Sequence, residues 1–588
     1  MTDVRVPVLI VGGGGAGLTA SMLLSTLGVE SLLVSALPTT SILPKAHVLN
    51  QRTMEILRDV GVADAVYARG TPPQHMQATA WYAGLAGAHP DTGRRIAHME
   101  AWGDGGRNPH WAAASACRST NLPQIRLEPI LRARAEALAP GRVRFAHELV
   151  DFSQDAEGVR AEVLDRDAGA RYLVRADYLL ACDGGRTVGP KLGVALEGQR
   201  NLASEVSFHV TADLSRWSRD PDVLIRWLWL AESGALAVLV PMGPERWGAD
   251  SEEWVFHLNY PADDARSLDD ARVEADMRRA LGIGELPVTI HKISRWSLEG
   301  VLAERFRVGR AFLVGDAAHR HPPTGGLGLN AAIQDAHNLC WKLAAVLRGQ
   351  ASDALLDSYE PERRAVTGRN VERALESALN QLRVGQVLGL DPKAGADANW
   401  AALGRLWSAR PEDVEHHRET LRMFASQSME FSEHNVECGY TYASGAVVAD
   451  GTPAPVPVDD IRVYVPSTRP GAPLPHAELD GPDGERLPLM DLVAPGRFLL
   501  IAGEDGAAWC EAAERVAKRL ELPLDAIRIG HLGGEYRDPR SSWARQREIS
   551  PQGALLVRPD RFVAWRSLGA QADPDARLER ALQEILAR

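Results

Sequence analysis

Cysteine is scarce in this chain, which has 5 cysteines among 588 residues. None of them forms a CxxC pair or another metal-ligand spacing, so we expect neither a disulfide framework nor a zinc site. No apolar run approaches the ~20 residues that span a bilayer, and the N-terminus lacks the segments of a signal peptide. These absences favour a cytoplasmic protein that has no membrane partner.

An excess of positive charge is also missing. Lys and Arg number 65 against 77 Asp and Glu, which gives a formal net charge of -12, and no stretch concentrates basic residues. A nucleic-acid partner is therefore not expected, and small molecules are the likelier class of ligand. The length exceeds what one hydrophobic core usually supports, which predicts two or three domains.

Glycines near the N-terminus form the first motif that carries chemistry. Residues 4–35 read as strand, glycine turn, helix and strand, and Gly12, Gly14 and Gly17 give GxGxxG at the turn. Such glycines let backbone N–H groups approach a pyrophosphate at a helix N-terminus. The acidic residue expected at the end of the second strand is absent, and Ser35 stands there instead. The motif therefore does not choose between NAD, NADP and FAD.

Four further regions differ in their patterns. Residues 200–295 alternate in hydrophobicity, which predicts an antiparallel sheet in a separate layer. A long helix is expected from Asn330 to a stop at Gly349, followed by mostly helical sequence to about residue 440. Pro and Gly become frequent over 444–475, which is typical of a connector. The remainder reads as a small α/β module.

Two later segments resemble a known family when they are taken with the glycine turn. "LLACDGG", which contains Asp183, and "FLVGDAAHRHPPTGGLGLN" are similar to fingerprints of the class A flavoprotein aromatic hydroxylases, the family of para-hydroxybenzoate hydroxylase and phenol hydroxylase. "LPKAHVLNQRTMEILRDVGV", "RPGAPLPH" and "GALLVRPDRFVAWR" resemble the phenol hydroxylase branch, and most of all its 2,4-dichlorophenol 6-monooxygenase-like members.

The resemblance implies an α/β fold in four parts. These are a discontinuous, Rossmann-like FAD-binding domain of the para-hydroxybenzoate hydroxylase type, an inserted antiparallel-sheet substrate domain, a helical connector and a C-terminal thioredoxin-like domain. Their expected ranges are 1–75, 115–195 and 295–385 for FAD, 76–114 and 196–294 for substrate, 386–445 for the connector and 446–588 for the last domain. Cys510 is the only cysteine of that last domain, so dithiol chemistry is excluded and packing or subunit contact in a homodimer is expected.

The implied reaction is reduction of FAD by NADH or NADPH, addition of O2 to give a flavin C4a-hydroperoxide, and oxygen transfer to a phenolic or related aromatic ring. Asp316 is implied to bind the ribityl chain, Pro323 to stiffen the wall at the reactive edge, and the following helix start to meet the charged edge of the reduced flavin. The expected cofactor-binding residues are Gly12, Gly14, Gly15, Ala16, Gly17, Ser35, Lys45, Gln124, Asp183, Asp316, Gly326, Leu327, Gly328, Leu329 and Asn330.

A base that accepts the phenolic proton is the main catalytic expectation. His47 stands where phenol hydroxylase has an aspartate, and its ordinary pKa near 6.5 would let it titrate in the working range. Tyr260 and Arg226 are alternatives for this role, and Arg52 is a weaker candidate for orienting substrate or cofactor. The substrate pocket is expected to use residues of the antiparallel layer, namely Arg226, Phe208 and Leu239.

Two departures from the family and three rival functions remain at this point. Lys45 replaces a family arginine over the cofactor, and Pro190 replaces another in the Asp183 segment. "RWLWLAES" is superficially similar to the WxWxIP signature of flavin-dependent halogenases. An NAD-dependent dehydrogenase would use the first motif alone and leave the other two segments unexplained. A non-catalytic flavin-binding module is the third rival, which the set of Asp316, Pro323 and Asn330 disfavours. His319 and His321 have no partner at ligand spacing, so we expect wall residues and no metal.

Overall fold

The central sheet contains the N-terminal glycine turn. The computed structural model describes residues 3–262, 264 and 268–588. The path through this sheet runs in the order β18 (Arg307–Val308), β19 (Ala311–Leu313), β10 (Ala170–Ala181), β1 (Asp3–Val11), β2 (Ser31–Ser35) and β7 (Val143–Phe145), and β8 (His147–Gln154) and β9 (Val159–Asp165) extend β10. β19, β10, β1, β2 and β7 are parallel, and β1 and β2 are largely buried, as expected for a sheet covered by helices.

Helices pack around the central sheet from distant parts of the sequence. α1 (Gly15–Thr26) contacts both α5 (Gln124–Leu138) and α8 (Leu327–Leu347). α8 begins three residues before the predicted start, because Gly326 has φ +66 and forms its N-cap. The shorter elements of this region are β3 (Val48–Leu49), α2 (Gln51–Asp59), α3 (Ala63–Arg69), β6 (Thr120–Asn121), α6 (Val188–Lys191), β11 (Leu196–Gln199), β17 (Gly300–Ala303) and β20 (His319–Arg320).

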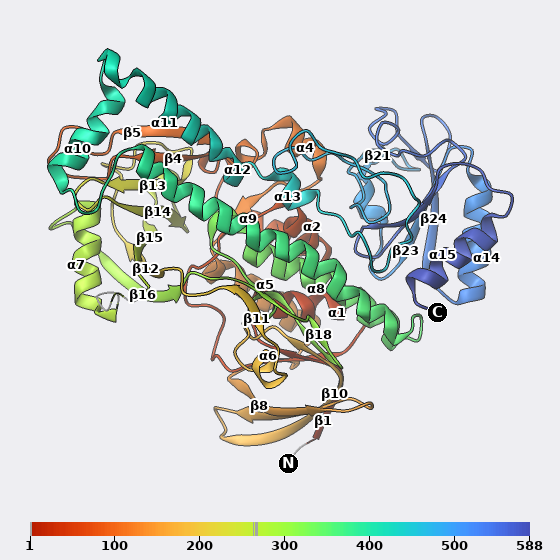
Figure 1. The fold of residues 1–588 in the computed structure, drawn as a ribbon. Coiled ribbons are helices and arrows are strands. Elements are labelled where there is room, and N and C mark those ends of the chain that lie inside the picture. Colours follow the sequence, from red (N-terminus) through yellow and green to blue (C-terminus); the bar gives the residue numbers. More distant parts are fainter. Residues whose placement is uncertain (1–2, 263, 265–267) are drawn as a thin grey trace.

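A second sheet, the lateral sheet, lies at the left of Figure 1. Its strands follow the order β16 (Thr289–Ser297), β12 (Ser204–Thr211), β15 (Glu253–Tyr260), β14 (Ala235–Gly243), β13 (Val223–Leu230), β4 (Ala78–Tyr82) and β5 (Arg95–Glu100). One face packs against α7 (Asp270–Leu281), whose Val273, Met277 and Leu281 join the apolar core of that side. The other face is turned toward the central sheet and α9 (Tyr359–Val387).

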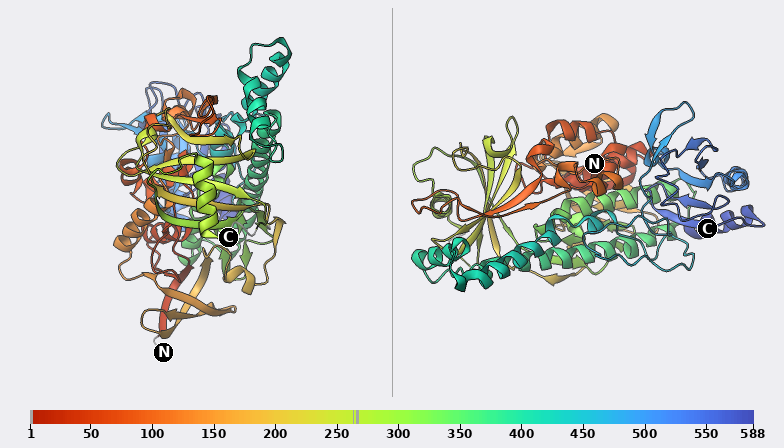
Figure 2. Two further views of the ribbon diagram at one scale, coloured as in Figure 1. Left: turned by 90° about the vertical axis from the view of Figure 1, so that its left-hand side faces the viewer. Right: turned by 90° about the horizontal axis from the view of Figure 1, so that it is seen from above.

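Helices then lead back across the molecule to the C-terminal domain. α9 extends from the lateral sheet toward that domain. The other helices of this region are α4 (Pro109–Ala114), α10 (Ala396–Gly404), α11 (Val414–Ser426), α12 (Ser428–Phe431) and α13 (His434–Cys438). No helix or strand occurs over residues 439–477, which include the Pro- and Gly-rich residues 444–475. Figure 2 shows the resulting elongated arrangement, with the central sheet between the lateral sheet and the C-terminal domain.

The C-terminal domain is a mixed sheet with two helices. Its strands run in the order β22 (Arg486–Pro488), β21 (Glu478–Asp480), β25 (Tyr536–Arg537), β24 (Leu524–Gly530), β23 (Phe498–Gly503), β26 (Ala554–Val557) and β27 (Val563–Ser567). β23 and β24 are parallel and joined by α14 (Ala507–Leu520), whereas β26 and β27 are antiparallel and precede α15 (Pro574–Ile585). These elements form a βαβ unit followed by a hairpin and a helix, within the region that the sequence predicts as a small α/β module.

Buried charges and rings attach the C-terminal domain to α8 and α9. Arg558 donates to both carboxylate oxygens of Glu362, at 2.7 and 2.9 Å, and Lys342 donates to the same carboxylate at 2.7 Å. All three side chains are fully buried. Phe498 packs edge-on against Trp341 at 5.8 Å between ring centroids. The contact between the C-terminal domain and these two helices is therefore a continuous part of the core. Among the described residues, no helix is long and apolar enough to cross a membrane.

A single buried carboxylate joins three segments around the central cleft. Asp335 of α8 accepts hydrogen bonds from Gly315 N at 3.1 Å, from His319 Nε2 at 2.7 Å and from Arg363 Nε at 2.7 Å. Burial alone would raise the pKa of Asp335, but His319 and Arg363 outweigh burial and hold it below its ordinary value. The sequence interpretation of His319 as a wall residue missed this carboxylate, which lies 16 positions later.

Replacing Asp335 by Asn should destabilise the fold strongly, because Arg363 would keep its charge in a site without water. Removing one partner of a buried ion pair costs about 3–5 kcal/mol. The comparison is the urea midpoint of the FAD-loaded variant against that of Glu148→Gln, which breaks an exposed pair with Arg166. We expect a change below about 1 kcal/mol for the control. Equal midpoints for the two variants would contradict the role of Asp335.

Candidate active site

The glycine turn after β1 leaves no room for side chains. Gly12 has φ +117, and a Cβ there would lie 2.0 Å from Cys182 O. A Cβ on Gly17 would lie 2.0 Å from Gly12 O, and one on Gly15 would lie 2.6 Å from Leu329 Cδ1. α1 begins after Gly14 without a side-chain cap. Its first backbone N–H groups are thus free at a positive helix end that fits a pyrophosphate.

A carboxylate does lie beside the turn, although it comes from another helix. Ser35, at the end of β2, is buried and pairs with Phe145 of β7. Glu128 of α5 places Oε1 3.5 Å from the position of a Cβ on Gly14 and accepts a hydrogen bond from Ser41 N at 2.6 Å. Sequence reasoning missed Glu128, and its only signal was its place four residues after Gln124 in "LPQIRLEPIL".

The GDAAH segment and the start of α8 face the same cleft. Gly315 has φ +64 and lies close to both Ala332 and Ala16. Asp316 follows it at the carboxyl end of β19, is exposed, and has no hydrogen-bond partner for its carboxylate among the described residues. Pro323 is exposed as well. An aspartate at this position is free to accept a hydroxyl of a bound cofactor.

Backbone N–H groups at the start of α8 are available, whereas the side chain of Asn330 is not. α8 begins at Leu327 without a side-chain cap, so the N–H groups of Leu327, Gly328 and Leu329 lack helical partners. Asn330 Oδ1 accepts from Asn50 N, and its Nδ2 donates to Val48 O, both at 3.0 Å. Asn330 therefore holds β3 against α8 and leaves the ligand to the backbone.

Three other predicted cofactor residues mainly shape loops. The Asp183 carboxylate accepts from the N–H groups of Gly185, Thr187 and Val188 at 2.7–3.0 Å, so it closes the turn after β10. Gln124 N donates to Pro44 O and Ala46 O, both at 2.9 Å. These bonds support the loop of Lys45, which is exposed and has φ +46.

His47 occupies a defined tautomer in the same loop. Its Nδ1 lies 2.6 Å from Asn121 Oδ1, and Asn121 Nδ2 donates to Thr71 Oγ1 at 2.7 Å. The Asn121 oxygen accepts only, so Nδ1 carries the hydrogen and Nε2 keeps its lone pair. Burial lowers the pKa of His47 to about 4, against a smaller opposing effect of Asn121. The expectation that His47 titrates in the working range is therefore wrong.

The predicted substrate residues Phe208, Leu239 and Arg226 lie on the face of the lateral sheet that packs against α7. Phe208 and Leu239 are fully buried in that core, and Arg226 is 1% exposed and donates to the Val223 and Asp220 carbonyls. Tyr260 lies in the same core and donates to Asp276. Their side chains therefore belong to the core on the α7 side of the sheet, opposite the face that is turned toward α9.

Arg52 and a histidine pair also form structural contacts. Arg52 is buried and paired with Glu55 at 2.5 Å, beside α13, which makes it part of the core.

His209, Glu253 and His291 place possible ligand atoms within 4.8 Å of one another. Glu253, however, already pairs with Arg126 at 2.7 Å and His209 at 2.6 Å. The guanidinium neutralises the only carboxylate, which disfavours a cation there.

Three buried carboxyl groups lie behind the turn that precedes α8. Glu430 Oε1 accepts from Gly325 N at 3.4 Å, and Glu433 Oε1 lies directly over Gly325, where a Cβ would approach it to 2.3 Å. Burial raises the pKa of Glu430 to about 7 and that of Glu437 to about 8, and burial with the neighbouring carboxyls raises the pKa of Glu433 further. Sequence reasoning did not find this cluster.

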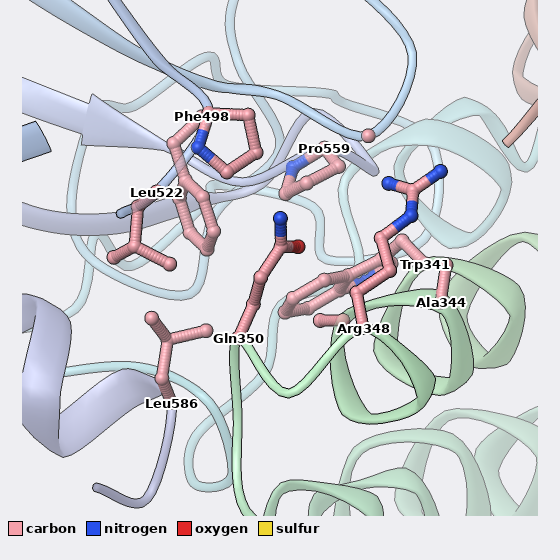
Figure 3. A pocket seen from close by; sticks show the side chains of 11 residues that line it. Trp341, Ala344, Arg348, Gln350, Phe498, Leu522, Pro559 and Leu586 are labelled. Atoms are coloured by element: carbon pink, nitrogen blue, oxygen red, sulfur yellow. The ribbon is translucent and has the colours of Figure 1, made fainter. Parts of the chain in front are cut away.

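A separate small cavity lies between α8 and the C-terminal domain (Figure 3). It is lined by Trp341, Arg348, Phe498 and Pro559, among others. Its volume of about 10 Å³ is the space of one water molecule. The cavity is too small for an aromatic substrate and is remote from the glycine turn.

The comparisons with known proteins agree with this geometry. Residues 5–374 match the family described as FAD binding domain, and residues 467–588 match the aromatic-ring hydroxylase C-terminal domain. The chain belongs to the FAD-dependent aromatic-ring hydroxylases. Within that family, it is 36% identical to 2,4-dichlorophenol 6-monooxygenase of Delftia acidovorans, over 100% of this chain and 99% of that protein. It is 34% identical to phenol 2-monooxygenase of Pseudomonas sp. (strain EST1001), over 98% and 92%.

Solved structures of the family show the same fold. The flavin-dependent monooxygenase PieE in complex with FAD and substrate has a TM-score of 0.92 and 38% identity, over 100% of both chains. Aklavinone-11 hydroxylase with FAD and aklavinone has a TM-score of 0.78 and 31% identity, also over 100% of both. These matches favour a hydroxylase over a halogenase or an NAD-dependent dehydrogenase. Trp227 and Trp229 of the halogenase-like segment are buried strand residues.

The carboxyl cluster predicts a pH-dependent stability. The pKa of Glu437 is about 8 in the folded hydroxylase, well above that of an unfolded glutamate. Its contribution to stability is therefore full below about pH 4 and is lost as pH rises through 8. Glu437→Gln cannot ionise, so the variant should gain stability over the parent on going from pH 6 to pH 9, by about 2–3 kcal/mol. Urea midpoints at both pH values measure this gain.

Glu415→Gln is the matched control, because Glu415 is 67% exposed on α11. Its effect on the urea midpoint should be small and similar at the two pH values. If Glu437→Gln changes stability by the same amount at pH 6 and pH 9, Glu437 does not have a raised pKa.

Proposed function

We propose that this hydroxylase acts on a phenolic ring whose hydroxyl group donates a hydrogen bond to His47 Nε2. The chain of Thr71, Asn121 and His47 supports this proposal, because it presents an unprotonated nitrogen in a loop that adjoins the α8 start. FAD, when bound, carries electrons from NADH or NADPH and reacts with O2. Residues of the chain then have to position the ring and accept the proton of its hydroxyl group.

The low basicity of His47 defines its part in the reaction. A free phenol has a pKa near 10, so full proton transfer to a group of pKa about 4 would cost about 8 kcal/mol. His47 therefore holds the substrate as a phenol in the ground state. It orients the hydroxyl group and accepts the proton as oxygen transfer makes that hydroxyl more acidic. This differs from the sequence expectation of a base that forms a phenolate in advance.

The cofactor contacts follow from groups that the cleft leaves available. Gly12, Gly14, Gly15, Ala16 and Gly17 would hold the pyrophosphate through the start of α1. Ser35 and Glu128 would lie on its adenosine side, and Asp316 would accept a ribityl hydroxyl. The N–H groups of Leu327 and its neighbours would meet the pyrimidine edge, where negative charge develops on reduction. Pro323 would form the rigid wall at the reacting ring.

We also propose a division into four domains, a homodimer and a location in the cytoplasm. We assign 1–75, 115–195 and 295–385 to the FAD-binding domain and 76–114 and 196–294 to the substrate domain. The strands of the lateral sheet support the second assignment, except that β16 continues to Ser297. Residues 386–445 form the helical connector and 446–588 the last domain, which we propose joins two copies. Five unpaired cysteines fit the reducing cytoplasm. Sedimentation would test the homodimer.

His47→Ala should lower product formation by about 100-fold or more while FAD stays bound, because the phenol loses its proton acceptor. The measurement compares hydroxylated product, NAD(P)H oxidation and peroxide release on a phenol panel. The deficit should shrink at high pH, where the phenol ionises unaided. Between about pH 5.5 and 8 the parent should show no transition that is absent from the variant, since His47 is neutral throughout.

Two other variants complete this test. Asn121→Leu removes the bond that orients His47 and should reduce product formation in the same direction. His98→Ala changes a partly exposed histidine on β5 that pairs with Asp222, and it should have no effect. Unchanged turnover in His47→Ala would remove His47 from the mechanism, and the absence of any hydroxylated phenol from the parent enzyme would contradict the proposed substrate class.

A further inference from the structure

Four polar side chains form a cluster on the cleft face of the lateral sheet. Ser207 of β12 lies opposite His257 of β15, with 2.8 Å between Oγ and Nδ1. Glu205 Oε1 lies 3.3 Å from the same nitrogen, and Trp296 Nε1 donates to Ser207 Oγ at 3.0 Å. The side chain of Glu205 is 7% exposed and that of His257 is 20% exposed. The cluster therefore holds Nδ1 of His257 and leaves Nε2 without a partner among the described residues.

The side of the sheet follows from strand alternation. Val206, Phe208, Phe256 and Leu258 pack toward α7, so their neighbours Glu205, Ser207 and His257 point the other way. Glu253 shares that direction and receives Arg126 of α5, a helix of the central region. The polar cluster thus faces the seam between the lateral sheet and the residues around α5.

His47 borders the same seam. Leu122 N donates to His47 O at 2.8 Å, directly before α5 begins, and α5 reaches β14 and β15 through Arg126. His257 also makes a small contribution to the lowered pKa of His47. The cleft consequently has a polar group on each of two walls.

The other residues on this face of β14 and β15 are mainly apolar, so the polar cluster is an exception on it. Val238, Val240 and Val255 occupy the same face of β14 and β15 and belong to the core that includes Trp81 and Phe431. Aromatic pockets are lined mainly by such side chains, with a few placed polar groups that set orientation. A half-buried imidazole whose outer nitrogen is free is such a group, because an unmatched polar atom is costly once a ligand excludes water.

We propose that His257, held by Ser207 and Glu205, binds a second hydrogen-bonding group of the substrate, and that the substrate is a phenol carrying a further hydroxyl or carbonyl group. This inference rests on the proposed function, since His47 receives the first hydroxyl. A hydroxyl group both donates and accepts, so it matches either tautomer of His257. The second group lies on the part of the ring that faces β12 and β15.

A hydrolytic Ser, His and Glu triad is not what this geometry provides. In such a triad the acid binds one imidazole nitrogen and the serine binds the other. Here Ser207 and Glu205 both approach Nδ1. The serine also accepts from Trp296, which holds it as a support for the ring.

The test measures binding to the FAD-loaded enzyme, through the change in flavin absorption, for matched pairs of ligands. The pairs are resorcinol with 3-methylphenol, catechol with 2-methylphenol, and 4-hydroxyacetophenone with 4-isopropylphenol. We expect the parent to prefer the bifunctional member of at least one pair by about five- to tenfold, the range of one added hydrogen bond. His257→Leu should abolish the preference and leave the Kd of the monophenol within about twofold.

Two variants separate recognition from a structural role. His257→Gln keeps a donor and an acceptor and should retain part of the preference. His291→Leu alters an exposed histidine on the same sheet that contacts Thr211, and it should change neither Kd. A parent that shows no preference, or a His257→Leu enzyme that keeps it or loses both ligands equally, would overturn the inference. Failure of the proposed function would instead appear as absence of hydroxylated product from the parent, whatever its binding preference.

Discussion

The cleft of this hydroxylase depends on the buried carboxylate of Asp335. It connects the turn at Gly315, the strand at His319 and the helix at Arg363, and its side chain is fully buried. A buried charge requires compensation from every direction, so these three segments have to meet in one arrangement. The same arrangement places Asp316 and the start of α8 on the open side. The positions of Asp316 and of the α8 start therefore depend on the buried ion pair of Asp335 and Arg363.

The second half of the active site comes from the way two sheets meet. The lateral sheet is covered by α7 on one side and faces the central region on the other. Arg126 joins its inner strands to α5, and the residues before α5 hold His47. The loop of His47, the start of α8 and the His257 cluster are consequently supplied by segments far apart in sequence.

Several site features were predictable because they depend on local chemistry. The glycines at 12 and 17 have no space for a Cβ, and the glycines before α8 adopt positive φ values that a side chain would oppose. Asp316 follows a strand at the carboxyl edge of a parallel sheet, a place where ligands bind. The prediction that Phe208 and Leu239 contact the substrate had no such basis. Alternation divides a strand into two faces but does not say which face meets the cleft.

The amino-acid sequence by itself determined the glycine turn, the family, the long helices and the position of His47, because each depends on neighbours along the chain or on an ordered set of motifs. Only the tertiary structure decided that Glu128 approaches the turn, that burial lowers the pKa of His47 and that Ser207 and Glu205 hold the ring of His257. Those properties depend on burial and on distances between residues remote in sequence. Desolvation and hydrogen-bond geometry exist only after the segments have packed together.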